Sequence, residues 1–155
     1  MELKTKLLVE PGKQEILITR DFEIPVESLY TAYVEAAFIE QWMGTKVMKL
    51  DCKRHGSFHF VTTDPMGNEH HFSGTIHDCE PNMKITRTFE MEQTPFAVQL
   101  EYLEFIPIDE SNSRLVMQIV FKSIEMRDNL LKMPFAQGLN MAHNRLELTL
   151  KNKSK

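Results

Sequence analysis

The clearest hydrophobic pattern in the chain lies near its end, from Pro134 to Lys151. Proline suits the first helical position, where its missing N–H costs nothing. Apolar residues then recur every three or four positions, and they fall on one stripe of a helix: Phe135, Leu139, Ala142, Leu146 and Leu150. Polar residues take the opposite side: Gln137, Asn140, Asn144, Glu147 and Lys151. The pattern predicts a long amphipathic helix that buries one face.

Most of the chain before this helix alternates between apolar and polar residues, which is typical of strands with one buried face. We expect these strands at residues 14–22, 46–52, 57–63, 69–79, 83–91, 97–108 and 114–122. Short polar turns such as Asp64–Asn68 and Asp109–Ser113 separate neighbouring strands. Strands joined by short turns favour an antiparallel sheet, which needs a cover on its apolar face.

The period changes between Val26 and Trp42, where apolar residues recur at three and four positions. Pro25 ends the first strand, and Gly44 provides a stop after Trp42. This stretch predicts two short helices, and a third is expected at residues 125–132. The order indicates an α+β fold, in which a curved antiparallel sheet of about six to seven strands wraps around the long C-terminal helix. At 155 residues the chain is expected to form a single domain over residues 1–155.

Charge and composition exclude several classes of partner. The net charge is −4 and no five like charges follow one another, so we expect no nucleic-acid binding. Neither a signal peptide nor a stretch of ~18 apolar residues is found, so we expect no membrane segment. Two cysteines, Cys52 and Cys79, do not make a disulfide framework. We expect a cytoplasmic protein.

Several segments carry a resemblance that covers nearly the whole chain. They are Ile18–Pro25, Leu29–Tyr33, Ile39–Trp42, Phe72–Ile76, Glu80–Pro81, Gly138–Asn140 and Asn144–Leu146. Together they resemble the family named after the activator of a heat-shock chaperone ATPase, within the START-like, helix-grip (SRPBCC) superfamily. The resemblance implies a sheet that grips a long C-terminal helix around a cavity for apolar ligands, and it places the chain in a stress-response context.

Three positions depart from the family pattern. The family often has tryptophan where Met43 and Leu139 stand, and leucine where His143 stands. These changes alter the expected cavity wall, so the ligand of a relative cannot be assigned to this chain.

The candidate ligand-binding residues are those that share the inward face of the expected sheet and helix. They are Trp42, Phe58, Phe60, Phe72, Ile85, Arg87, Phe89, Tyr102, Met117, Ile119, Phe135, Leu139 and His143. Ten methionines in the chain suit an adaptable wall. The alternative is that the apolar members simply fill a solid core, as regularly spaced apolar residues usually do.

Two of these candidates are polar. Arg87 shares a face with Ile85 and Phe89, and a buried guanidinium needs an acceptor, which a ligand carboxylate would supply. The alternatives are a pairing with Glu104 or another internal acid, or a bulge that turns Arg87 outward. His143 would serve as a hydrogen-bond handle or a general base, or it would be half exposed and inert.

We expect neither a metal site nor a catalytic site in this chain. His59, His71, His77 and Cys79 share the parity opposite to the cavity, without a recognised metal spacing, so we expect no metal site. No nucleophile motif or phosphate-binding loop occurs, and we expect no cofactor and assign no catalytic residue.

The sequence favours a carrier or sensor that binds a small apolar molecule, with a carboxylate or hydroxyl as its polar end. The chain is expected to be a monomer or a homodimer. Two alternatives remain: an enzyme of the cyclase or hydrolase type that uses the same cavity, and an interaction protein that modulates a chaperone ATPase.

Overall fold

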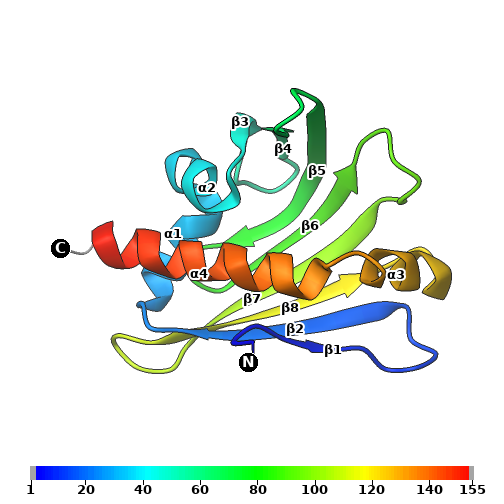
Figure 1. The fold of residues 1–155 in the computed structure, drawn as a ribbon. Coiled ribbons are helices and arrows are strands. Elements are labelled where there is room, and N and C mark those ends of the chain that lie inside the picture. The colour runs from blue at the N-terminus through cyan, green and yellow to red at the C-terminus, as the bar shows by residue number, and fades with distance from the viewer. Residues whose placement is uncertain (1–2, 154–155) are drawn as a thin grey trace.

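The computed structural model describes residues 3–153, which form one antiparallel sheet of eight strands and four helices. The strand order is β1-β2-β8-β7-β6-β5-β4-β3. The strands are β1 Lys6–Leu8, β2 Glu15–Phe22, β3 Lys46–Leu50, β4 Ser57–Thr63, β5 Glu69–Glu80, β6 Lys84–Met91, β7 Gln99–Pro107 and β8 Ser113–Val120. The helices are α1 Val26–Val34, α2 Ala36–Met43, α3 Ile124–Leu131 and α4 Phe135–Lys153. The sheet curves, and α4 lies across its concave side (Figure 1).

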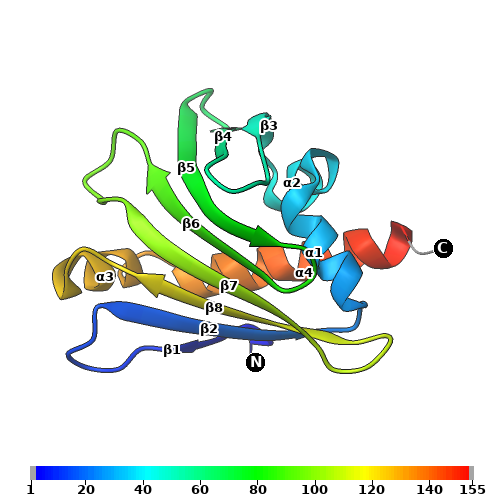
Figure 2. The same cartoon turned by 180° about the vertical axis from the view of Figure 1, so that it is seen from behind.

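Alternation of side chains decides which face of the sheet meets α4. On β2, Ile16 and Ile18 are fully buried and Phe22 is nearly so. Ile16 pairs with Ile119 of β8, and Ile18 pairs with Met117, so apolar side chains from both strands share the inner face. Within residues 3–153, no helix covers the outer face of the sheet, as the view from behind shows (Figure 2). The core therefore lies between the sheet and the helices.

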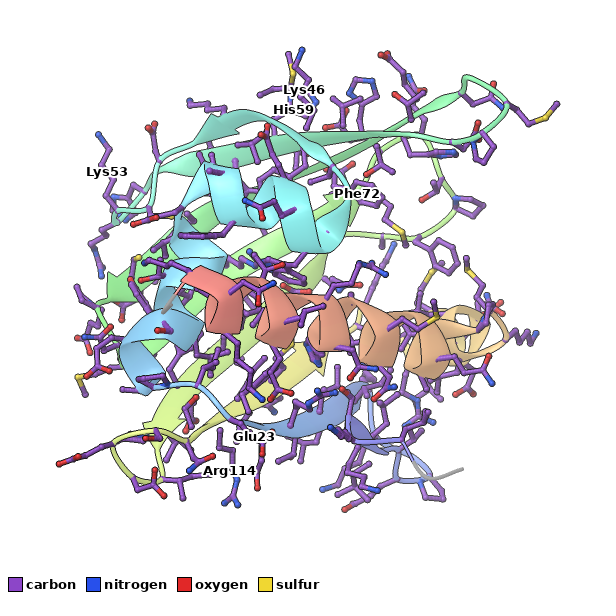
Figure 3. All side chains as sticks on the ribbon, turned by 60° about the vertical axis from the view of Figure 1, so that its left-hand side comes forward. Glu23, Lys46, Lys53, His59, Phe72 and Arg114 are labelled. Atoms are coloured by element: carbon purple, nitrogen blue, oxygen red, sulfur yellow. The ribbon has the colours of Figure 1, made fainter. Side chains whose placement is uncertain are left out.

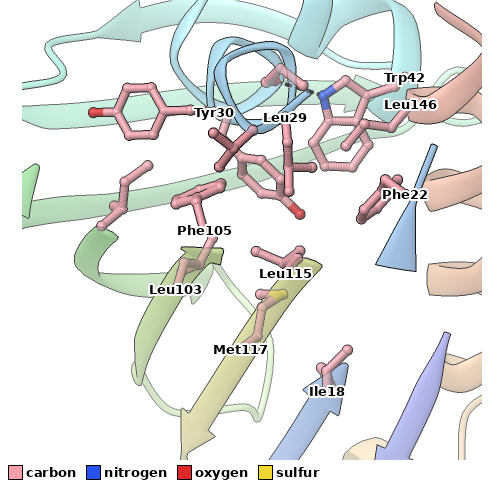
Figure 4. Packing of buried hydrophobic residues seen from close by; sticks show 14 of the residues in the cluster. Ile18, Phe22, Leu29, Tyr30, Trp42, Leu103, Phe105, Leu115, Met117 and Leu146 are labelled. Carbon is pink, nitrogen blue, oxygen red and sulfur yellow. Dashed lines mark hydrogen bonds between the residues drawn. The ribbon is translucent and has the colours of Figure 1, made fainter. Parts of the chain in front are cut away.

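Helices α1 and α2 form a second layer over one end of the sheet. The chain breaks between them at Glu35, whose backbone is extended, and α2 ends at Gly44 in the left-handed conformation (φ 62°) that glycine adopts without strain. The indole N–H of Trp42 donates to the carbonyl of Ala32 at 2.8 Å, which ties the end of α2 back to α1 (Figure 4). Arg145 Nε on α4 donates to the Trp42 carbonyl at 3.1 Å. Helix α2 therefore lies against the C-terminal half of α4.

The apolar stripe of α4 is buried to different degrees along its length. Phe135, Leu139 and Ala142 in the first half are only partly buried, whereas Leu146 and Leu150 are fully buried. The first half begins beyond the end of α2, so it covers the sheet without a second helix layer beside it (Figure 1). A gap between helix and sheet is thus expected under the first half.

The predicted fold class is confirmed, with small corrections to its elements. All seven predicted strands are present with ends shifted by up to two residues, and the four helices lie where the patterns placed them. The strand missing from the prediction is β1, which is only three residues long and pairs Lys6 with Thr19 of β2. Within residues 3–153, no helix combines the length and the apolar character that a membrane span requires.

Candidate functional site

A pocket of about 340 Å³ lies under the first half of α4. Its floor comes from β2, β6, β7 and β8, one wall from α1 and α2, and its roof from α4. Most of the lining is apolar, and the full set is Ile18, Tyr33, Trp42, Met43, Arg87, Phe89, Gln99, Glu101, Met117, Ile119, Pro134, Phe135, Gly138, Leu139 and Ala142. Pockets that hold small molecules in proteins typically measure ~300–1,000 Å³ and are mostly apolar with a few placed polar groups. This pocket has the same kind of lining, and its volume lies near the lower end of that range.

A second hollow of about 220 Å³ adjoins the pocket at the corner between α3 and α4. The two share Phe89, Gln99, Pro134 and Phe135 as lining residues. The second hollow also includes Met133, whose side chain is half exposed and flexible. The hollow at this corner therefore continues the pocket towards the exposed side chain of Met133.

A larger hollow of about 590 Å³ lies on the surface near β1, β2 and the end of α4, but its lining has the wrong chemistry for an apolar ligand. Charges of both signs line it, and several of them are paired, either with one another or with the neighbouring Lys151. Arg114 Nε donates to Asp21 Oδ1 at 2.6 Å, and Lys151 Nζ donates to Glu23 Oε2 at 2.9 Å. Arg114 and Glu23 point away from the core at this edge of the sheet (Figure 3). We therefore take the apolar pocket as the candidate site.

Three polar side chains form a connected array on the floor of the pocket. Arg87 Nε donates to Glu101 Oε1 at 2.9 Å, and Gln99 Nε2 donates to Glu101 Oε2 at 2.9 Å. Arg87, Gln99 and Glu101 are each at most 9% exposed. Each charge is thus paired, as buried charges need to be.

Aromatic rings fix the position of the guanidinium. The Arg87 Cζ atom lies 5.1 Å from the centroid of the Phe58 ring and 5.7 Å from that of Phe89, a geometry favourable for cation–π attraction. Phe58 reaches this place because Gly74 on the neighbouring strand leaves room for it. A Cβ at Gly74 would lie 2.6 Å from the Phe58 ring and 2.0 Å from the Thr88 carbonyl oxygen. Gly74 therefore helps to hold the polar array in position.

The structure brings seven of the thirteen predicted site residues together around the pocket. They are Trp42, Arg87, Phe89, Met117, Ile119, Phe135 and Leu139. Four others, Phe58, Phe60, Phe72 and Ile85, point to the inner side but pack among neighbouring side chains and do not line the pocket. The predicted set was therefore drawn too wide, because inward orientation does not distinguish a pocket wall from solid core.

Tyr102 is placed differently from the expectation, on the outer face of the sheet. Its side chain is 41% exposed, and it pairs with Thr86 of β6. The inward positions of β7 are instead Gln99, Glu101, Leu103 and Phe105. Two polar residues at the start of this strand obscured the alternation, so the phase was misjudged by one residue. Because of the same error, Gln99 and Glu101 were not predicted as site residues. They share the parity of Leu103, so an inward Leu103 would have placed both on the inner face.

His143 is fully buried but is not among the residues that line the pocket. Its Nδ1 lies 2.8 Å from Thr5 Oγ1, and its Nε2 lies 3.5 Å from the Tyr33 hydroxyl. Burial, together with the positive charge of Arg20, lowers the pKa of His143 to about 3. The ring is therefore neutral near pH 7 and is a weak proton acceptor. Burial raises the pKa of the Tyr33 hydroxyl, so that group is neutral as well.

Arg20 organises the side of α4 that faces β1 and β2. Its Nη1 donates to Thr5 Oγ1 and Asn140 Oδ1, both at 3.3 Å, and its Nη2 donates to Asn144 Oδ1 at 2.9 Å. Glu147 Oε1 lies 3.8 Å from Nη2, while its Oε2 accepts from a backbone N–H of the β2–α1 turn. Part of the polar side of α4 thus faces a buried arginine. The signal was present in the sequence, since Arg20 shares its parity with Ile16 and Ile18.

Histidines of β4, β5 and the β3–β4 loop lie beside one another in two pairs, and Glu69 Oε1 lies 3.6 Å from Nε2 of His71 in one of them. His59 Nε2 lies 2.8 Å from His71 Nδ1, and the His55 and His77 rings lie 5.6 Å apart. His59 sits near Lys46 at the edge of the sheet remote from α4 (Figure 3). Among residues 3–153, no three His, Cys, Asp or Glu side chains are grouped so that they could hold a metal ion.

Cys52 and Cys79 are free thiols in the same region as α1. The Tyr30 hydroxyl lies 2.8 Å from Cys79 Sγ, and burial raises the pKa of the Cys52 thiol to about 12. A thiol with a raised pKa holds little thiolate near pH 7, so Cys52 is a poor nucleophile.

Comparisons with known proteins agree with the fold. A family model described as "Activator of Hsp90 ATPase homolog 1-like protein" matches residues 23–151. A protein from Rhodobacter sphaeroides is 20% identical with a TM-score of 0.82, covering 95% of this chain and 99% of its own. Protein Ms6760 from Mycobacterium smegmatis is 19% identical with a TM-score of 0.81, covering 94% and 96%. A protein from Arthrobacter aurescens is 14% identical with a TM-score of 0.83, covering 95% and 91%. A search of curated proteins finds no match.

Proposed function

Because the chain belongs to the family of Activator of Hsp90 ATPase homolog 1-like proteins, with a START-like helix-grip fold, we propose that it binds a small apolar molecule in the pocket under α4. The protein acts as a carrier or sensor, and it carries out no chemistry on the ligand. The observation that supports this most strongly is a mostly apolar pocket of about 340 Å³ with a single buried polar array on its floor.

The apolar walls supply the affinity. Removing apolar surface from water contributes roughly 25 cal/mol per Å². Met117 and Ile119 offer such surface from the floor, and Leu139 offers it from the roof. Met43 and Met117 are flexible side chains that adapt to ligands of different shape. The polar array then orients the ligand, because the polar end of the ligand forms hydrogen bonds with the array and not with the apolar walls.

The roof of the pocket gives the sharpest test. Gly138 lies on α4 among the lining residues, and a Cβ added there would meet no atom within 4 Å. Gly138→Leu therefore adds a bulky apolar side chain at the pocket lining, starting from a Cβ that meets no atom, and it replaces glycine by a better helix former. Gln137→Leu is the matched control, because it places the same new residue at the neighbouring exposed position, which does not line the pocket.

Binding can be followed with N-phenyl-1-naphthylamine, an uncharged apolar probe that fluoresces in apolar surroundings. We expect saturable fluorescence with the unchanged protein and with Gln137→Leu, and binding weaker by at least ~tenfold with Gly138→Leu, equivalent to ~1.4 kcal/mol. Quenching of Trp42, the sole tryptophan, provides an independent readout from the pocket wall. Absence of saturable binding, or equal binding by all three proteins, would contradict the proposal.

Modulation of a chaperone ATPase is a second candidate, favoured by the description of the matching family. This role requires an exposed surface that contacts another protein, and it does not require the pocket. If it holds, a purified Hsp90 should hydrolyse ATP faster in the presence of this chain, and Gly138→Leu should act as well as the unchanged protein. If Gly138→Leu loses the probe and the ATPase rate does not respond to either protein, the binding role stands alone.

A further inference from the structure

The two charges in the pocket lining cancel. Among the described residues that line the pocket, Arg87 is the cation and Glu101 is the anion, and they form a direct ion pair. Beyond the lining, the buried base His143 is neutral near pH 7, and the buried Arg20 has Glu147 as its counter-charge at 3.8 Å. A ligand that enters the pocket therefore meets no net charge.

The polar array nevertheless keeps unused hydrogen-bonding capacity. Both oxygens of Glu101 are engaged, one by Arg87 Nε and one by Gln99 Nε2. The terminal Nη1 and Nη2 donors of Arg87 and the Oε1 acceptor of Gln99 have no hydrogen-bond partner within residues 3–153. These atoms still reach solvent. Within residues 3–153, the side-chain atom that is both fully buried and without a hydrogen-bond partner is Arg20 Nε. Because Arg87 and Gln99 both line the pocket, it offers donors at one point and an acceptor at another.

We infer that the ligand carries an uncharged polar end that both accepts and donates hydrogen bonds, such as a primary amide or a hydroxyl beside a carbonyl. Its acceptor takes a hydrogen bond from a terminal nitrogen of Arg87, and its donor gives one to Gln99 Oε1. This inference rests on the proposed binding function and specifies the class of ligand.

An ionised carboxylate fits the array less well. It would leave water for a buried site whose single cation already has a counter-charge, and it would lie near the Glu101 carboxylate. It also lacks a hydrogen to donate to Gln99 Oε1, which would stay unsatisfied. An uncharged end avoids both costs.

The test compares two ligands of the same shape, 2-naphthamide and 2-naphthoate, by isothermal titration calorimetry at pH 7. The planar amide and carboxylate are nearly isosteric, so the comparison isolates charge and the donated hydrogen. We expect the unchanged protein to bind the amide at least ~tenfold more tightly. Equal or tighter binding of the carboxylate would overturn the inference.

Glu101→Gln provides the reversal. Removing the anion leaves Arg87 as an unpaired buried cation, so a ligand carboxylate becomes the better partner. We expect the ratio of the two affinities to shift by at least ~tenfold towards 2-naphthoate. Glu104→Gln is the matched control, because it removes the same charge from the same strand on the exposed outer face, and the preference for the amide should persist.

Thermal unfolding establishes whether Glu101→Gln is folded. If it is not, the double variant Arg87→Gln, Glu101→Gln removes both charges together and should retain the preference for the amide. An unchanged affinity ratio in folded Glu101→Gln, or a preference for the carboxylate in the double variant, would contradict the inference. Failure of the binding function is distinguishable, because then neither naphthalene compound nor N-phenyl-1-naphthylamine would bind.

Discussion

The two halves of α4 carry one continuous apolar stripe, yet they have different surroundings. Leu146 and Leu150 in the second half are fully buried against α1, α2 and the sheet. In the first half, Phe135 and Leu139 are only partly buried and lie over the pocket. The close-up of the core shows Leu146 beside Trp42 and Phe22 on the closed side (Figure 4). The same pattern of residues thus seals the core at one end and covers a pocket at the other.

The difference arises from the helix layer next to α4. Helix α2 ends at Met43, and Trp42 and Met43 form the border between the closed half and the pocket. Beyond that border α4 continues over the sheet without α1 or α2 beside it. Side chains of α4 and the sheet therefore leave a space that α1 and α2 help to fill under the second half. An amphipathic stripe therefore indicates which face turns inward, but not whether the space beneath it is filled.

The largest expected effect compares equivalent truncations in the two halves. Leu146→Ala should lower the free energy of unfolding by ~2.5–5 kcal/mol, because it opens a cavity in closed core. Leu139→Ala should cost less than ~2 kcal/mol, because its side chain already borders a hollow and fewer contacts are lost. Urea unfolding of both variants at pH 7 measures the two values. Equal losses would show that the first half is packed as tightly as the second.

The second effect concerns His143, at the start of the closed half. Its pKa is lowered to about 3 in the folded protein, whereas in the unfolded chain it is near 6.5. Below pH 6.5 the unfolded state therefore binds a proton that the folded state does not. Stability is lost as pH falls from 6.5 towards 3, by ~1.4 kcal/mol per pH unit from this residue.

His143→Leu isolates that contribution. The variant should lose less stability than the unchanged protein between pH 6.5 and pH 4.5, because the other ionisable groups are common to both proteins. The measurement is urea unfolding at three pH values in this range. Parallel pH dependences for the two proteins would show that His143 can be protonated in the folded state.

The smallest effect is at Gly138 in the first half. Gly138→Ala should raise the free energy of unfolding by ~0.5–1 kcal/mol, since alanine favours the helix and its Cβ would meet no atom. The opposite is expected at Gly74, where a Cβ would collide with the Thr88 carbonyl oxygen. Thermal unfolding of the two alanine variants measures both effects, and a loss of stability at Gly138 would indicate that the space beside it is occupied.

The sequence predicted the main elements because their periodic patterns are long. The stripe of α4 and the alternation of β2 and β8 each extend over at least eight residues. Strand β1 has only three residues, too few to show a period, and it depends on pairing with β2.

The candidate site was harder to predict than the fold. Its polar array occupies inward positions where the alternation pattern expects apolar residues, so Gln99 and Glu101 obscured the phase of β7. The boundary between pocket and solid core depends on where α2 ends relative to α4, which is a property of packing in three dimensions. Arg87 was predicted to need an acceptor, and the structure supplies an internal one, Glu101.

The most direct test of the account is a methyl NMR titration with 2-naphthamide, using labelled isoleucine and leucine side chains. The account predicts that the methyl signals of Leu139 and Ile119, which line the pocket, shift as the ligand binds. Those of Leu146 and Leu150, buried in the closed half, should stay in place. Shifts at Leu146 and Leu150 equal to those at Leu139, or no shift at any of these methyl groups, would contradict the distinction between the two halves of α4.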